Sequence, residues 1–143
     1  MEKFPALFEA QKAAQEERLR ACNRRTARYG LRLSEENIRA LSTARAVSLS
    51  DSGRVEFGGG ILEKLIDAFC DSPYLEQESY AQTLTDLQDA FYYFKNETLD
   101  TVSDDDLIAF MKEHFNDDCE GSVEYLTGSL LEDFGRLTRE EEL

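Results

Sequence analysis

The apolar residues of the chain recur mainly at the spacing of an α-helix. The clearest stretch runs from residue 80 to residue 94, where large apolar side chains follow one another at steps of four, three, four and three: Tyr80, Leu84, Leu87, Phe91 and Phe94. This period places side chains on one face of a helix. Shorter amphipathic patterns predict helices over 61–69 and 104–115, the second of them capped by Ser103, and a last helix from about Ser122 to Phe134.

Two more helices are predicted in the first third of the chain. From Phe4 to Tyr29 the sequence is rich in Ala, Gln, Glu and Arg, and Gly30 stands where a C-terminal cap is expected. Few residues of this stretch are apolar, so most of the long helix should lie in solvent. Ser34 then precedes two glutamates and a helical series of apolar residues, which is typical of an N-cap.

Residues 46–57 allow two interpretations. Apolar and polar residues alternate on both sides of Asp51-Ser52-Gly53, and this alternation favours a short β-hairpin. The same residues can instead continue the preceding helix to an end near Ser50, and we favour this second interpretation. The pattern as a whole predicts an all-α fold, a single-domain bundle of five to six helices, with a short hairpin near 46–57 as the alternative.

The composition predicts one packed core, and the first residues of the chain predict a cytoplasmic protein. Its 143 residues suit a single domain, and 41% of them are hydrophobic. The first residues offer neither the apolar region of a signal peptide nor a membrane span, so no membrane partner is expected. The three cysteines, Cys22, Cys70 and Cys119, are odd in number and far apart, which indicates reduced thiols rather than disulfides or a zinc site.

The charge is distributed unevenly along the chain. Residues 1–33 carry eight Lys/Arg against four Glu, a net +4, whereas residues 34–143 carry eight Lys/Arg against 26 Asp/Glu, a net −18, which together give −14. We therefore distinguish a basic, arginine-rich N-terminal helix, 1–33, from an acidic helical body, 34–143. An acidic body repels nucleic acid and anionic membranes, so both are disfavoured as partners.

Six arginines of the N-terminal helix are the candidate interaction residues: Arg18, Arg20, Arg24, Arg25, Arg28 and Arg32. They suit the acidic surface of a partner protein or a nucleic-acid backbone. The competing interpretation is that they pair with the acidic body of their own chain, or with that of a second copy in a homo-oligomer. We favour that interpretation, because the intramolecular acids are always present at high effective concentration.

A candidate metal site lies between the last two predicted helices. Asn116, Asp118 and Glu120 occupy alternate positions, Gly121 takes the sixth place, and Glu124 follows, which resembles the outline of an EF-hand calcium loop. The twelfth position should hold a bidentate acid, and Thr127 stands there. A calcium-responsive helix-loop-helix is therefore the alternative function, and an acidic corner between two helices explains the same residues.

The sequence gives little reason to expect an enzyme. His114 is the only histidine, so catalysis by His114 or Cys70 is the third and least favoured hypothesis. The glycines at 58–60 precede a helix as in a phosphate-binding loop, but Ile61-Leu62-Glu63 follows in place of the Gly-Lys-Ser/Thr that such a loop requires, so we interpret them as a hinge. We expect no catalytic residue and no cofactor.

Three strings of the sequence resemble an uncharacterised family of small acidic bacterial proteins: RVEFGGG at 54–60, AFCDSPY at 68–74 and FYYFKNE at 91–97. The resemblance covers about residues 34–135. It implies a bacterial, cytoplasmic single domain and carries no activity, ligand or site residue with it. Our leading hypothesis from the sequence is a non-enzymatic protein–protein interaction or regulatory module.

Overall fold

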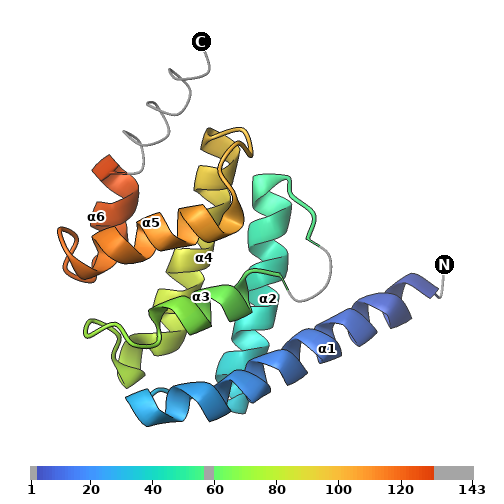
Figure 1. The fold of residues 1–143 in the computed structure, drawn as a ribbon. Helices are drawn as coiled ribbons and strands as arrows, with labels where there is room; N and C mark the ends of the chain where they lie inside the picture. Colours follow the sequence, from blue (N-terminus) through green and yellow to red (C-terminus); the bar gives the residue numbers. More distant parts are fainter. Residues whose placement is uncertain (1–2, 57–59, 131–143) are drawn as a thin grey trace.

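The computed structural model describes residues 3–56 and 60–130 (Figure 1). The described residues form helices and loops and contain no strand. The helices are α1 Lys3–Thr26, α2 Glu35–Ser52, α3 Leu62–Phe69, α4 Tyr80–Glu97, α5 Asp104–Asn116 and α6 Val123–Tyr125. The prediction of an all-α, single-domain bundle is therefore confirmed, and none of these helices is long and apolar enough to cross a membrane.

Capping residues define where two of the helices begin. The Ser34 side chain accepts a hydrogen bond from the Asn37 N–H, and the Asn37 side chain accepts one from the Ser34 N–H, which closes a capping box at the start of α2. Ser103 accepts from the Asp106 N–H at the start of α5. Local side-chain chemistry therefore defines both starts, as the sequence predicts.

The ambiguous segment is helical up to Ser52, so the favoured interpretation is correct and the hairpin does not form among the described residues. Gly53 takes a left-handed conformation with φ 68° and donates its N–H to the carbonyls of Leu49 and Ser50. This is a common way for glycine to end a helix. Of the three consecutive glycines, only Gly60 lies within the described residues.

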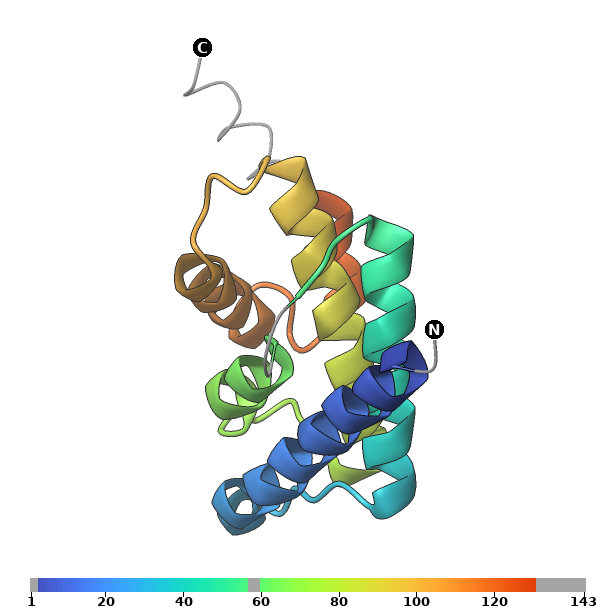
Figure 2. The ribbon, with the colours of Figure 1, turned by 90° about the vertical axis from the view of Figure 1, so that its right-hand side faces the viewer.

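Helices α2 and α4 run alongside each other. Helices α3 and α5 lie on one side of α4, and α1 lies across α3 and α2 (Figures 1 and 2). One hydrophobic cluster joins α3, α4, α5 and the start of the last helix, and it includes Phe69, Phe94, Phe115 and Leu126. All five apolar positions predicted for the buried face of α4 are buried.

A second hydrophobic cluster ties α1 to the rest of the molecule. It contains Leu19 and Cys22 of α1 together with Leu33, Leu41 of α2 and Leu84 of α4, all of them buried. The change in charge between residues 33 and 34 therefore falls inside one packed cluster. The basic helix and the acidic body therefore share a core. Residues 10–14 of α1 are exposed, as predicted.

The last helix begins at Val123, close to its predicted start. Ser122 accepts a hydrogen bond from the Tyr125 N–H as its N-cap, and a π-helical turn over Leu126–Leu130 continues it. The predicted end at Phe134 lies outside the described residues.

Candidate interaction surface

Three of the six candidate arginines bind acidic groups of their own chain. Arg20 of α1 places its guanidinium against the Glu35 carboxylate, with an Nε–Oε1 distance of 2.9 Å. Arg25 pairs with Asp67 at 2.9 Å, and Arg18 approaches Glu63 at 3.7 Å. These contacts join α1 to α2 and to α3.

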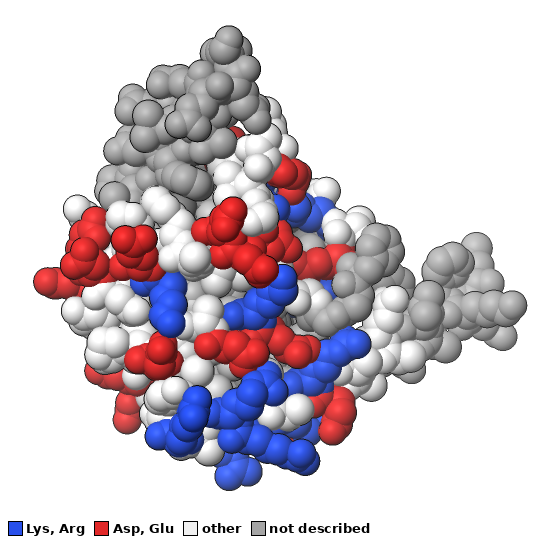
Figure 3. Space-filling view, viewed as in Figure 1, with Lys and Arg blue, Asp and Glu red and all other residues white. Residues whose placement is uncertain are grey.

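The other three arginines, Arg24, Arg28 and Arg32, are exposed and form no ion pair with the described residues. The Arg28 guanidinium lies 4.9 Å from the centroid of the Tyr29 ring. We call these three residues the arginine face. Figure 3 shows basic side chains gathered where the C-terminal half of α1 lies, and acidic side chains spread over much of the rest of that view.

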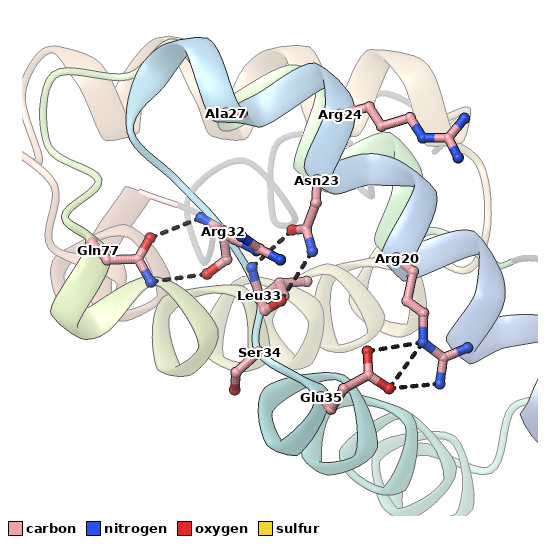
Figure 4. A pocket seen from close by; sticks show the side chains of 9 residues that line it. All are labelled: Arg20, Asn23, Arg24, Ala27, Arg32, Leu33, Ser34, Glu35 and Gln77. Carbon is pink, nitrogen blue, oxygen red and sulfur yellow. Dashed lines mark hydrogen bonds and ion pairs between the residues drawn. The ribbon is translucent and has the colours of Figure 1, made fainter.

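Two side-chain amides hold the backbone beneath the arginine face. Asn23 donates from Nδ2 to the Leu33 carbonyl at 2.9 Å and accepts the Leu33 N–H at 2.8 Å (Figure 4). Gln77 likewise donates from Nε2 to the Arg32 carbonyl at 2.8 Å and accepts the Arg32 N–H at 2.7 Å. Leu31 and Leu33 are buried on either side, so the alternation of an extended segment directs the Arg32 side chain outward.

These groups surround a shallow cavity of about 650 Å³ at the corner between α1 and α2. Seven of its nine lining residues carry polar side chains: Arg20, Asn23, Arg24, Ala27, Arg32, Leu33, Ser34, Glu35 and Gln77, with Ala27 and Leu33 the two apolar ones. Three arginines and one glutamate line it, so the cavity carries a local net charge of +2 in a chain whose total is −14. Arg20 holds the pKa of Glu35 below its usual range by hydrogen bonding, so that carboxylate stays charged.

The four candidate metal ligands have different surroundings. Asn116 accepts a hydrogen bond from the Ser72 hydroxyl at 2.5 Å, and Asp118 lies 3.2 Å from His114 Nδ1. Glu120 and Glu124 are exposed. Among the described residues, no group of three or more His, Cys, Asp or Glu is placed to hold a metal ion.

The loop that follows α5 is instead closed by its backbone. The Gly121 N–H donates to the Phe115 carbonyl at 2.8 Å, and the Cys119 N–H donates to the His114 carbonyl at 2.9 Å. Gly121 has φ 83°, a conformation that glycine adopts without strain. Glycine in the sixth place therefore supplies the left-handed residue that closes this loop onto α5, a role that the EF-hand outline does not distinguish.

The two residues of the enzyme hypothesis lie in separate surroundings. The His114 ring packs on Phe110, with centroids 4.4 Å apart, beside Asp118. Cys70 is buried and its thiol donates to the Asp67 carbonyl at 3.6 Å. Burial raises the pKa of the Cys70 thiol, which keeps it protonated and weakly nucleophilic near neutral pH.

Stability should fall at alkaline pH because of the buried thiols. Burial raises the pKa of Cys22 to about 11, so the folded state holds this proton more tightly than the unfolded state, whose thiol ionises near 9. The protonated thiol contributes its full stabilisation below pH 9. This contribution, about 2 kcal/mol for Cys22, is lost as the pH rises from 9 toward the pKa of the folded state. Urea unfolding of the wild type and of Cys22→Ala at increasing pH measures it: the variant should lose less stability, and parallel curves would contradict the assignment.

Asn23 and Gln77 were not predicted from the sequence, although they hold the backbone at Leu33 and Arg32. Asn23 bonds a residue ten positions away and Gln77 one 45 positions away. Neither belongs to a local motif, so no spacing in the sequence indicated them. The separation of the arginines into paired and unpaired sets was equally hidden, because Glu35, Glu63 and Asp67 come from other helices.

Comparison with known proteins places the chain in a family without assigning it a function. No curated protein and no solved structure matches it. A family model matches residues 18–143, which includes the region 34–135 of the sequence resemblance and all six candidate arginines. The match covers most of the chain, so the protein belongs to the family described as "Family of unknown function (DUF6323)".

Proposed function

We propose that this domain is a non-enzymatic protein-interaction module that docks an acidic segment of a partner on the arginine face. The observation that carries the proposal is the absence of ion pairs at Arg24, Arg28 and Arg32 within the described structure, in a chain with 30 acidic residues. Arginines whose only role is to stabilise the fold are expected to form ion pairs within the chain, as Arg20 and Arg25 do. The unpaired set remains available to carboxylates from outside.

The local structure supports docking because it is ordered before a partner arrives. Asn23 and Gln77 hold the backbone of Arg32 and Leu33 from both sides. A surface held in this way loses less conformational entropy on binding. Arginine also matches a carboxylate with two parallel hydrogen bonds, which favours acidic side chains or a chain terminus as the docked groups.

The side chains considered for catalysis favour a binding role over an enzymatic one. His114 and Cys70 belong to separate environments, and burial suppresses the thiolate of Cys70. An acidic protein partner is favoured over nucleic acid because a total charge of −14 opposes the approach of a polyanion, whereas a short acidic segment meets only the local positive charge. A second copy of the chain is the alternative source of that segment.

A labelled poly-glutamate peptide tests whether the arginine face binds acidic segments at physiological ionic strength, where distant charges are screened. We expect the wild type to bind it despite the negative charge of the chain. Arg24→Glu/Arg28→Glu should weaken binding at least tenfold, because two favourable charge contacts of about 1 kcal/mol each become repulsive. Fluorescence anisotropy gives the two dissociation constants.

The matched control is Lys12→Glu/Lys64→Glu, which changes the net charge equally at exposed positions outside the arginine face. It should bind the peptide within about threefold of the wild type, since distant exposed charges are largely screened. Equal losses in the two variants would show a general charge effect and would refute the arginine face as the docking site.

A further inference from the structure

A second surface, separate from the arginine face, runs along the outer side of α4. Two shallow cavities of about 620 and 550 Å³ lie between α4 and α6 and between α2 and α4, and they share Asp89 and Tyr93. We call their combined surface the α4 groove. It shares no residue with the cavity of the arginine face.

The α4 groove exposes apolar side chains along its length. Val47 of α2 is 53% exposed and Tyr93 of α4 is 44% exposed. Ala44 and Val123, both half-buried, line the same surface. Contiguous apolar side chains bordered by polar ones on a folded domain indicate a binding surface more often than scattered single residues do.

The border of the α4 groove is acidic. Its lining contains Asp51, Asp86, Asp89 and Glu124 and no lysine or arginine. None of these four carboxylates forms an ion pair within residues 3–56 and 60–130, and Asp86 accepts a hydrogen bond from the neutral amide of Gln82. Helices α2, α4 and α6 thus supply apolar contact area and unpaired negative charge to one surface.

We propose that the α4 groove binds a basic amphipathic helix of a partner protein. Such a helix places an apolar stripe against Val47, Tyr93 and Val123, and its flanking lysines or arginines reach the four carboxylates. The charge of −14 adds attraction at long range and accelerates the encounter with a basic partner. The C-terminal segment of this chain fits less well, because residues 131–143 carry five Asp/Glu against two Arg.

This inference is independent of the proposed function, since different residues carry it. If both surfaces are used, the domain joins an acidic segment of one protein to a basic helix of another. The arginine face and the α4 groove then act as two ends of an adaptor. Either surface can fail in experiment without affecting the other.

The probe is a labelled amphipathic peptide of leucine and lysine. Its control is a peptide of the same composition whose residues are reordered so that no helical face is apolar. We expect Asp89→Lys/Glu124→Lys to weaken binding of the amphipathic peptide at least tenfold, because two attractions become repulsions. Tyr93→Ala, which changes no charge, should also weaken it several-fold by removing an exposed apolar anchor. In NMR spectra the peptide should shift amide signals mainly at residues 44–52, 85–96 and 123–128.

The matched charge control is Glu78→Lys/Glu113→Lys, two exposed acids outside the α4 groove that change the net charge by the same amount. It should weaken binding less than about threefold. Equal loss in both double variants, or equally tight binding of the reordered peptide, would mean general attraction to an acidic protein and would overturn the proposal. A concentration-dependent dimer that only Asp89→Lys/Glu124→Lys abolishes would assign the groove to a second copy, which also overturns it.

Discussion

Gly121→Ala is expected to destabilise the domain by about 3 kcal/mol, whereas Gly53→Ala should cost only about 1 kcal/mol. Both glycines take the left-handed conformation, with φ 83° at Gly121 and φ 68° at Gly53. They differ in space: a Cβ at Gly121 would lie 2.5 Å from Tyr74 Cβ and 2.8 Å from its Cγ, and a Cβ at Gly53 would meet nothing within 4 Å. The backbone penalty is shared, and only Gly121 adds a clash.

Tyr74 cannot relieve this clash by rotating its ring alone, because its Cβ atom makes the closest contact. The backbone at Tyr74 must shift, which also disturbs the edge-on contact between Tyr74 and Phe115. Urea unfolding of the two variants gives the difference directly. Equal destabilisation by the two substitutions would contradict the close packing of Tyr74 on the loop.

The result also separates two explanations for glycine at this position. A calcium loop needs glycine at its sixth place for a sharp turn, whereas a loop packed closely against an aromatic residue needs glycine because a Cβ has no room there. In the structure Gly121 closes the backbone onto Phe115 beneath Tyr74. Loss of stability in Gly121→Ala without any metal present supports the second explanation.

Leu19→Ala should destabilise the domain by about 3 kcal/mol. Leu19 is fully buried in the cluster that joins α1 to Leu33, Leu41 and Leu84, so its truncation leaves a cavity among side chains that are fixed by other helices. The loss should appear in the main unfolding transition, because α1 and the acidic body share this cluster. Thermal and urea unfolding measure the shift.

Lys12→Ala on the same helix is the control, because Lys12 is exposed, and it should change the stability by less than about 0.5 kcal/mol. If Leu19→Ala had an equally small effect, the charge boundary at residues 33 and 34 would also be a boundary in folding. Deletion of residues 1–33 would then be a fair test of function. With Leu19 in the core, charge reversal at exposed arginines is the cleaner experiment.

The sequence predicted the helices well because each carries its own local signals. The apolar period of α4 identified its buried face, and Ser34 and Ser103 identified two starts. The segment at 46–57 was ambiguous because its alternating pattern suits two structures. Gly53 in the left-handed conformation ends α2 there, and a single glycine does not reveal this from the sequence.

The candidate site could be predicted only in part, because its arrangement depends on contacts between distant residues. Arginine content identified α1 and the segment after it as the part of the chain that carries the candidate residues. Which arginines stay unpaired depends on where α2 and α3 place Glu35, Glu63 and Asp67, and that follows from packing rather than from spacing. The α4 groove was missed for the same reason, since three helices contribute to it.

Affinity capture from the native host in physiological salt tests the central claim most directly. The full chain, Arg24→Glu/Arg28→Glu and Lys12→Glu/Lys64→Glu are compared side by side, and captured proteins are identified by mass spectrometry. We predict one partner with an acidic segment that the wild type and the lysine control retain and the arginine variant loses. Equal recovery of every captured protein by all three chains would contradict docking on the arginine face.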